Sequence, residues 1–158
     1  MESTIAAPVK LRSVKIVGLK MVREKSLKYE ESMSCAQTVI NAVLPLFKDS
    51  YRELVVVVGL DTRNLPTVIH TVGIGCQTES AVYPGNVIKP LLLSNSTSFI
   101  IVHNHPSNSM FPSASDRELT VKLKEIGKLL NLPMLDHIIL NADGSDHYSF
   151  RSSGELVD

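Results

Sequence analysis

The chain has 158 residues, 44% of them apolar, which suits a single domain with one sizeable core. Its 16 basic and 16 acidic residues cancel to a net charge of zero, which argues against a large phosphate-binding surface and against a polybasic membrane anchor. No apolar run reaches the roughly 18 residues of a membrane helix. The first residues also lack the basic-then-apolar order of a secretory signal, so we expect a cytoplasmic protein with no membrane partner.

The N-terminal part of the chain predicts an arm, a strand and a helix. Residues 1–12 are short and polar, which favours a flexible arm ahead of a single domain over 13–158. Residues 14–25 contain alternating stretches that suit a half-buried strand. Residues 32–47 repeat apolar side chains at three- and four-residue steps, which predicts an amphipathic helix that Pro45 is expected to end.

The middle of the chain predicts a hairpin and an interrupted helix. Residues 53–61 form a continuous β-branched run, as in a strand buried on both faces. Residues 66–75 follow a turn-like segment and are expected to be the return strand. The helical pattern of residues 83–95 is interrupted by Pro90, which predicts a short or broken helix.

The remaining segments complete the sheet. Residues 97–105 predict another buried strand, and 113–132 show the clearest helical stripe in the chain. Residues 134–141 and 147–150 predict the last two strands. This order of strands and helices predicts an α/β (α+β) fold, with a mixed β-sheet flanked by helices.

Two cysteines and three of the histidines suggest no chemistry by their spacing. Cys35 and Cys76 lie far apart with no Cys-x-x-Cys pairing, so we expect buried free thiols and not a disulfide or a thiolate zinc site. His70, His137 and His147 are interpreted as hydrogen-bonded surface residues, although the apolar flanks of His137 also allow a place in or beside the core.

A possible metal site follows the strand at 97–105. Side chains two positions apart on a strand point to the same face, so His103 and His105 can act together as a two-nitrogen clamp. The loop after them can turn back and deliver Asp116 as a third ligand in the first turn of a helix. Three ligands leave a fourth position open for water, which predicts a catalytic site with one Zn²⁺ per chain. A catalytic site also needs a base, and Glu53 at the mouth of a buried strand is the best candidate.

Each of these residues also has a simpler interpretation. Asp116 stands three residues after Ser113, which is a capping-box variant, and the helix dipole alone favours an acid there. Glu53 can equally be a solvated strand terminus. For each residue considered singly, the simpler interpretation and the role in a metal site both stay open. The combination of these residues at this spacing favours the metal site.

These residues match a family pattern. His103-x-His105, seven residues, Ser113, two residues and Asp116, with an upstream glutamate, resemble the JAMM motif of the JAB/MPN metalloproteases. The segments "IIVHNHPS" and "LDHIILNADG" narrow the likeness, because residues 30–158 resemble the JAB domain of RadC-like proteins, historically labelled DNA repair proteins. The resemblance implies a JAB/MPN-like fold with a three-layer arrangement like that of cytidine deaminase.

The same resemblance implies roles for individual residues. His103, His105 and Asp116 would be the zinc ligands, Glu53 the general acid/base, and Ser113 a donor near the developing oxyanion. A helix cap is an equal alternative for Ser113. Asn108 stands where the family usually has glycine, and as a residue that tolerates left-handed backbone it could keep the turn. Gly85 and Asn86 stand where the family usually has a charged pair, so the resemblance does not decide how this part of the chain would contact a substrate.

The leading functional hypothesis is a zinc-dependent metallopeptidase, in which a metal-bound water attacks an amide or isopeptide carbonyl of a peptide or an isopeptide-linked protein. The alternatives are a DNA-associated repair factor or nuclease of the RadC type, and a metal-free interaction module on the same fold. Zero net charge counts against the nucleic-acid alternative, and the complete ligand set counts against the metal-free one. The sequence leaves the substrate and the oligomeric state open, with a homodimer as one option.

Overall fold

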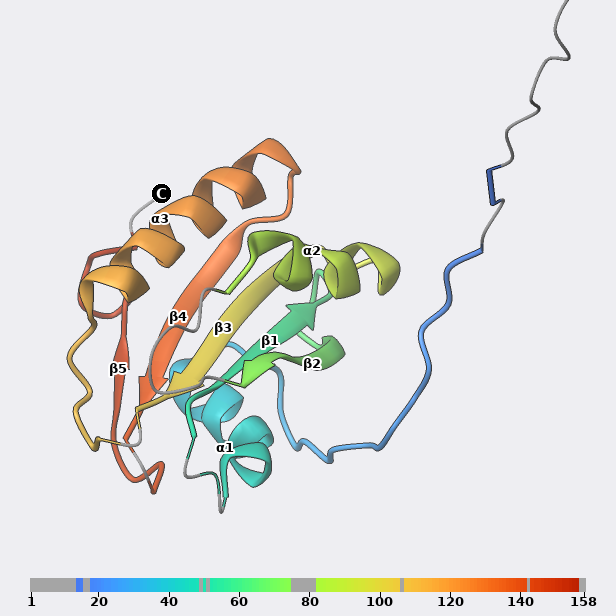
Figure 1. The fold of residues 1–158 in the computed structure, drawn as a ribbon. Helices are drawn as coiled ribbons and strands as arrows, with labels where there is room; N and C mark the ends of the chain where they lie inside the picture. Colours follow the sequence, from blue (N-terminus) through green and yellow to red (C-terminus); the bar gives the residue numbers. More distant parts are fainter. Residues whose placement is uncertain are drawn as a thin grey trace, which may run out of the picture.

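The computed structural model describes residues 14, 15, 18–48, 50, 52–74, 82–105, 107–141 and 143–156. Within these ranges one mixed sheet of five strands is flanked by three helices, which confirms the predicted α+β fold (Figure 1). In chain order the elements are α1 (Ala36–Phe47), β1 (Leu54–Leu60), β2 (Pro66–Ile74), α2 (Pro84–Leu93), β3 (Ser98–Asn104), α3 (Ala114–Leu129), β4 (Met134–Leu140) and β5 (His147–Ser149).

The sheet has the strand order β2-β1-β3-β4-β5. β1 runs antiparallel to β2 and to β3, so the predicted hairpin is confirmed. β3 and β4 are parallel, and α3 is the crossover between them, as a parallel pair requires. The start of α3 therefore lies close along the chain to the carboxyl end of β3, where the histidine pair stands.

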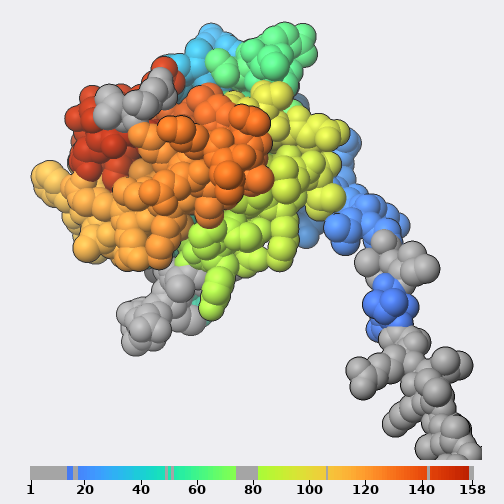
Figure 2. Space-filling view, turned by 90° about the horizontal axis from the view of Figure 1, so that it is seen from above, coloured from blue at the N-terminus to red at the C-terminus, as the bar shows by residue number. Residues whose placement is uncertain are grey.

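Helices cover both faces of the sheet and bury a core on each. α1 packs on one face, while α2 and α3 lie side by side over the other (Figures 1 and 2). The strand side chains alternate between the two cores with a period of two, so β1 and β3 are buried on both faces. On the α3 face the strands contribute Val55, Val57, Phe99, Ile101 and Ile139. The three layers agree with the arrangement that the resemblance implied.

Both internal prolines are accommodated within helices. α1 continues past Pro45 to Phe47, so the expected end at Pro45 is wrong. Pro45 lies in the last turn of α1, and the helix continues long enough to bury the Phe47 side chain. α2 is likewise continuous through Pro90 and not broken, because Val87 and Leu91 anchor it in the core on either side. Burial of those apolar side chains outweighs the local cost of proline.

The strand expected at 14–25 is also wrong. The described residues in this range lie outside any strand, and Val14, Leu19 and Val22 are exposed. Residues 18–25 run outside the globular body, where no described strand lies beside them (Figures 1 and 2). Alternation without a partner strand is not enough to form a sheet.

The expectations for the two cysteines and for membrane helices have different outcomes. Cys35 is exposed at the N-cap of α1, so its expected burial is wrong. Polar side chains are favoured at a helix N-cap, and the Cys35 thiol donates to Thr38 Oγ1 there. Cys76 lies outside the described residues. None of the described helices is long and apolar enough to cross a membrane.

Candidate metal centre

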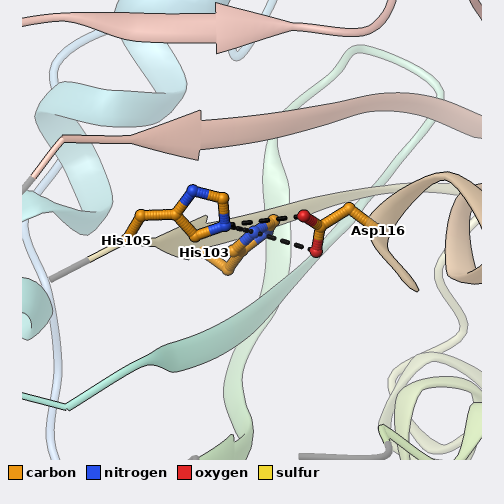
Figure 3. Close-up of side chains that lie close together, drawn as sticks. All are labelled: His103, His105 and Asp116. Atoms are coloured by element: carbon orange, nitrogen blue, oxygen red, sulfur yellow. Dashed lines mark hydrogen bonds and ion pairs between the residues drawn. The ribbon is translucent and has the colours of Figure 1, made fainter. Parts of the chain in front are cut away.

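Three side chains from two elements meet at the carboxyl end of β3. His103 is in the strand, on the face that α3 covers, His105 follows the last strand residue, and Asp116 is in the first turn of α3 (Figure 3). The Nε2 atoms of the two histidines are 3.0 Å apart. Asp116 Oδ1 is 3.2 Å from His103 Nε2, and its Oδ2 is 3.5 Å from His105 Nε2. Among the described residues this is the group of His, Cys, Asp or Glu side chains that could hold a metal ion.

The group lies near the surface but is largely shielded from water. The side chains of His103, Asp116 and His105 are 2%, 10% and 14% exposed. Burial alone would raise the pKa of Asp116, but hydrogen bonds from His103 and His105 hold that pKa far below its ordinary value. The same contact with Asp116 raises the pKa of His105, against the opposing effect of burial. Asp116 is therefore an ionised carboxylate facing two imidazoles.

The backbone around the histidines fixes their direction. The His105 N–H donates to Leu140 O at 2.9 Å, so the chain stays attached to β4 just beyond β3. Asn108 then takes a φ of 65°, and its N–H donates to His105 O at 3.0 Å. The expectation that asparagine can keep this left-handed turn is thus confirmed. The turn also brings the Ser109 carbonyl to His105 Nδ1, at 2.7 Å.

Ser113 acts as the N-cap of α3. Its hydroxyl accepts from Asp116 N, and its own N–H donates to Asp116 Oδ2 at 2.8 Å, which together form a capping box. The Ser113 hydroxyl also donates to Asp116 Oδ2 at 2.6 Å. The capping interpretation of Ser113 is confirmed. Because the capping bonds use Oδ2, they direct Oδ1 of Asp116 toward His103.

Glu53 is outside the three-residue group but lies near the same end of the sheet. It precedes β1, is partly buried, and contributes to raising the pKa of His105 by its charge. Since Val55 pairs with His103, the register extended by two residues places Glu53 opposite His105. Its backbone neighbours are held by the Asn104 side chain, which accepts from Leu54 N–H at 2.8 Å and donates to Arg52 O at 3.2 Å.

The other candidates divide into buried and exposed positions. His137 is fully buried in β4, so its interpretation as a surface residue is wrong, and its Nε2 lies 2.8 Å from His103 Nδ1. In the sequence, the one sign that His137 is buried beside His103 was its place within the apolar run "LDHIIL". His70 is exposed and His147 half-buried. Gly85 and Asn86 are exposed in the first turn of α2.

Comparison with known proteins gives one family. The family model described as the RadC-like JAB domain matches residues 33–155. A UPF0758 protein of Thermotoga maritima is 37% identical over 105 residues, which cover 66% of this chain and 46% of that protein. A UPF0758 protein of Clostridium botulinum is 35% identical over 150 residues, covering 92% of this chain and 64% of its own length. The chain thus spans from about half to just under two thirds of these relatives.

Proposed function

Because the chain belongs to the family of RadC-like JAB domains, we propose that it is a zinc-dependent hydrolase of the metallopeptidase or isopeptidase type. The JAB family includes hydrolases. One observation carries the proposal: two imidazoles and one carboxylate converge at a strand end, and among the described residues no fourth His, Cys, Asp or Glu side chain joins them. Catalytic zinc sites have this composition, whereas structural sites are closed by four protein ligands.

The dimensions of the group fit zinc. Zn–N and Zn–O bonds of about 2.0–2.1 Å in a tetrahedron place neighbouring ligand atoms about 3.3 Å apart. The two Nε2 atoms are 3.0 Å apart and His103 Nε2 lies 3.2 Å from Asp116 Oδ1, both close to that value, while His105 Nε2 lies 3.5 Å from the other carboxylate oxygen, Oδ2. Two imidazole nitrogens so close to each other and to a carboxylate are well suited to share one cation. Imidazole nitrogens suit zinc better than calcium or magnesium, which prefer oxygen ligands. His103, His105 and Asp116 would hold one ion per chain.

Glu53 is proposed as the general acid/base. A zinc ion at this site would lower the pKa of a bound water to about 7 and polarise a carbonyl oxygen. Glu53, opposite His105 in the extended register, would take the proton of the attacking water and deliver it to the leaving nitrogen. Ser113 remains a proposed oxyanion donor, although in the structure its hydroxyl proton is directed to Asp116 Oδ2. It would have to change partner to serve both roles.

Peptide or isopeptide bonds are proposed as the substrate class. Many phosphodiesterases hold two metals about 4 Å apart with additional carboxylates. The described residues contain one metal-competent group with a single carboxylate, and the whole chain has no net positive charge to attract a polyanion. Both features favour amide hydrolysis over DNA cleavage.

A paired measurement on two variants tests this function. Elemental analysis and zinc titration of the parent protein should give one zinc per chain. Asp116→Ala should lose zinc and activity together. Glu53→Gln should keep its zinc and lose activity by roughly 10²-fold or more, because it removes a proton acceptor and leaves all three ligands. Activity would be measured on fluorescent peptides and on an isopeptide-linked protein pair.

Three results would count against the proposal or a part of it. Absence of stoichiometric zinc in the parent would remove the metallohydrolase function altogether. Metal-dependent cleavage of DNA that is lost in Glu53→Gln, with peptides left intact, would replace the substrate class with phosphodiesters. Zinc loss in Glu53→Gln would instead make Glu53 a ligand and not the base.

A further inference from the structure

A chain of short hydrogen bonds runs from the His103 ring through two buried side chains to the backbone carbonyl of Asp116. His103 Nδ1 lies 2.8 Å from His137 Nε2. The other nitrogen of that ring, Nδ1, lies 2.7 Å from Thr120 Oγ1, and Thr120 in turn donates to the Asp116 carbonyl at 2.6 Å. Thr120 and His137 are buried. The chain therefore links a ligand on β3 to the backbone of a ligand on α3 by way of β4.

The protons in this chain can be assigned from donor and acceptor chemistry. A threonine hydroxyl carries one proton, and a carbonyl oxygen can only accept. The 2.6 Å contact with the Asp116 carbonyl therefore uses the Thr120 proton. Since the Thr120 oxygen has no second proton, it must accept one from His137 Nδ1–H.

The same reasoning continues to the metal ligand. His137 is 0% exposed, so its ring is neutral, and with the proton on Nδ1 its Nε2 can only accept. His103 must then donate from Nδ1, so Nε2, which faces His105 and Asp116, is the nitrogen available to a metal ion. Any other assignment places two bare acceptors, or two protons, face to face in the chain.

We propose that His137 is a positioning residue that holds His103 in the Nδ1–H form with Nε2 free to bind metal, and that Thr120 fixes His137 in turn. The inference rests on the proposed metal site. Ligand histidines usually donate their second nitrogen to a carboxylate, carbonyl or water, and His105 does so to Ser109 O. For His103 the acceptor is instead a second, buried imidazole, that of His137.

The surroundings of His137 hold its ring as a fixed acceptor. Its ring stacks on Phe150, with centroids 4.9 Å apart and planes 9° from parallel. In the β3–β4 register His137 pairs with Ile101, which places it beside His103 on the face under α3. Stacking sets the plane of the ring, and the Thr120 hydroxyl sets its tautomer. The ring can therefore determine the orientation of His103 before any metal binds.

The first test reads the tautomers directly. Long-range ¹H–¹⁵N spectra of the zinc-loaded full chain, labelled on the imidazole nitrogens, should show a proton on Nδ1 of His103 and on Nδ1 of His137, with zinc on Nε2 of His103. Zinc bound through Nδ1 of His103, or a proton on Nε2 of His137, would overturn the inference. No variant is required, so this result does not depend on how a substitution folds.

The second test measures zinc affinity by competition with a chromophoric chelator. His137→Phe keeps the stacking on Phe150 but removes the acceptor, and its zinc Kd should rise roughly 10- to 100-fold. His137→Gln, which can present an oxygen near the former Nε2, should recover part of this loss. His147→Phe is the matched control on β5 and should bind zinc like the parent protein.

Substitutions at Thr120 test whether its hydroxyl fixes the tautomer of His137. Thr120→Val removes the hydroxyl at nearly constant shape and should weaken zinc binding, whereas Thr120→Ser should not. If His137→Phe does not fold, this pair carries the affinity test. A parental Kd in both His137→Phe and Thr120→Val would refute the inference while leaving the proposed function intact. A parent protein that binds no zinc would refute the proposed function itself.

Discussion

Asp116 uses its two carboxylate oxygens for different purposes. Oδ2 accepts the N–H and the hydroxyl of Ser113 and so begins α3, and it also lies 3.5 Å from His105 Nε2, while Oδ1 faces His103. The simpler interpretation of this residue as a helix cap and the interpretation as a ligand are therefore compatible. An acid at this position satisfies the start of the helix and also supplies the one negative charge of the metal group.

The lowered pKa of Asp116 predicts how stability depends on pH. Hydrogen bonds to the imidazoles lower the pKa of the folded state below that of the unfolded chain, about 3.9. The native state thus binds fewer protons than the unfolded state at acid pH, and the stabilisation present above about pH 4 is lost as pH falls further. In the presence of chelator, urea unfolding between pH 6 and 2.5 should show this loss.

Asp116→Asn is the variant that isolates this contribution. It keeps a side-chain oxygen for the cap but cannot ionise, so its unfolding free energy should decline less steeply below pH 4 than that of the parent. Parallel declines in the two proteins would mean that other carboxylates cause the acid sensitivity. Asp136 should contribute in the opposite direction, because burial raises the pKa of its carboxyl group.

At the scale of elements, Gly127 in α3 leaves room for the turn that joins α3 to β4. A Cβ at this position would lie 2.5 Å from the Leu132 carbonyl oxygen, which is backbone and cannot rotate away. Gly127→Ala should therefore destabilise the protein by roughly 1–3 kcal/mol, as expected when a packed site is overfilled. Urea denaturation would measure this change.

Gly85→Ala is the matched control in another helix. A Cβ at Gly85 meets nothing within 4 Å, and alanine favours the helical backbone. This variant should be neutral or more stable by up to about 1 kcal/mol. Equal destabilisation by the two substitutions would show that the contact with Leu132 does not decide the effect at Gly127.

At the scale of the whole molecule, the folded unit should begin near Met33. Met33 is buried in the core beside α1, its N–H donates to Asn64 O at 2.8 Å, and the family model also begins at residue 33. The described residues from 18 to 32 are almost all exposed. Deleting residues 1–31 should therefore shift the melting temperature by no more than a few degrees and leave zinc binding unchanged.

This truncation also tests the predicted division of the chain into an arm over 1–12 and a domain over 13–158. A large fall in melting temperature would mean that residues before Met33 belong to the folded unit after all. Calorimetry and zinc titration of the truncated and full chains, measured side by side, give both readouts. The result expected from the exposed side chains is a domain that begins later than the sequence indicated.

Features encoded by short-range periodicity were predictable from the sequence. A period of two places His103 and His105 on one face of a strand, and the spacing of Ser113 and Asp116 produces the capping box. Both patterns lie within a few residues, so their geometry follows from the local backbone. The central strands were equally predictable, because their long β-branched runs are buried on both sides.

Only the tertiary structure decided the features that depend on partners distant in the chain. The described residues of 14–25 form no strand because no described strand lies beside them, and α2 stays continuous at Pro90 because the core holds both sides of it. His137 contacts His103, 34 residues away, and Asn104 holds the backbone beside Glu53 some 50 residues away. A sequence states which donors and acceptors exist, but their pairing across the sheet depends on strand order and register, which folding alone determines.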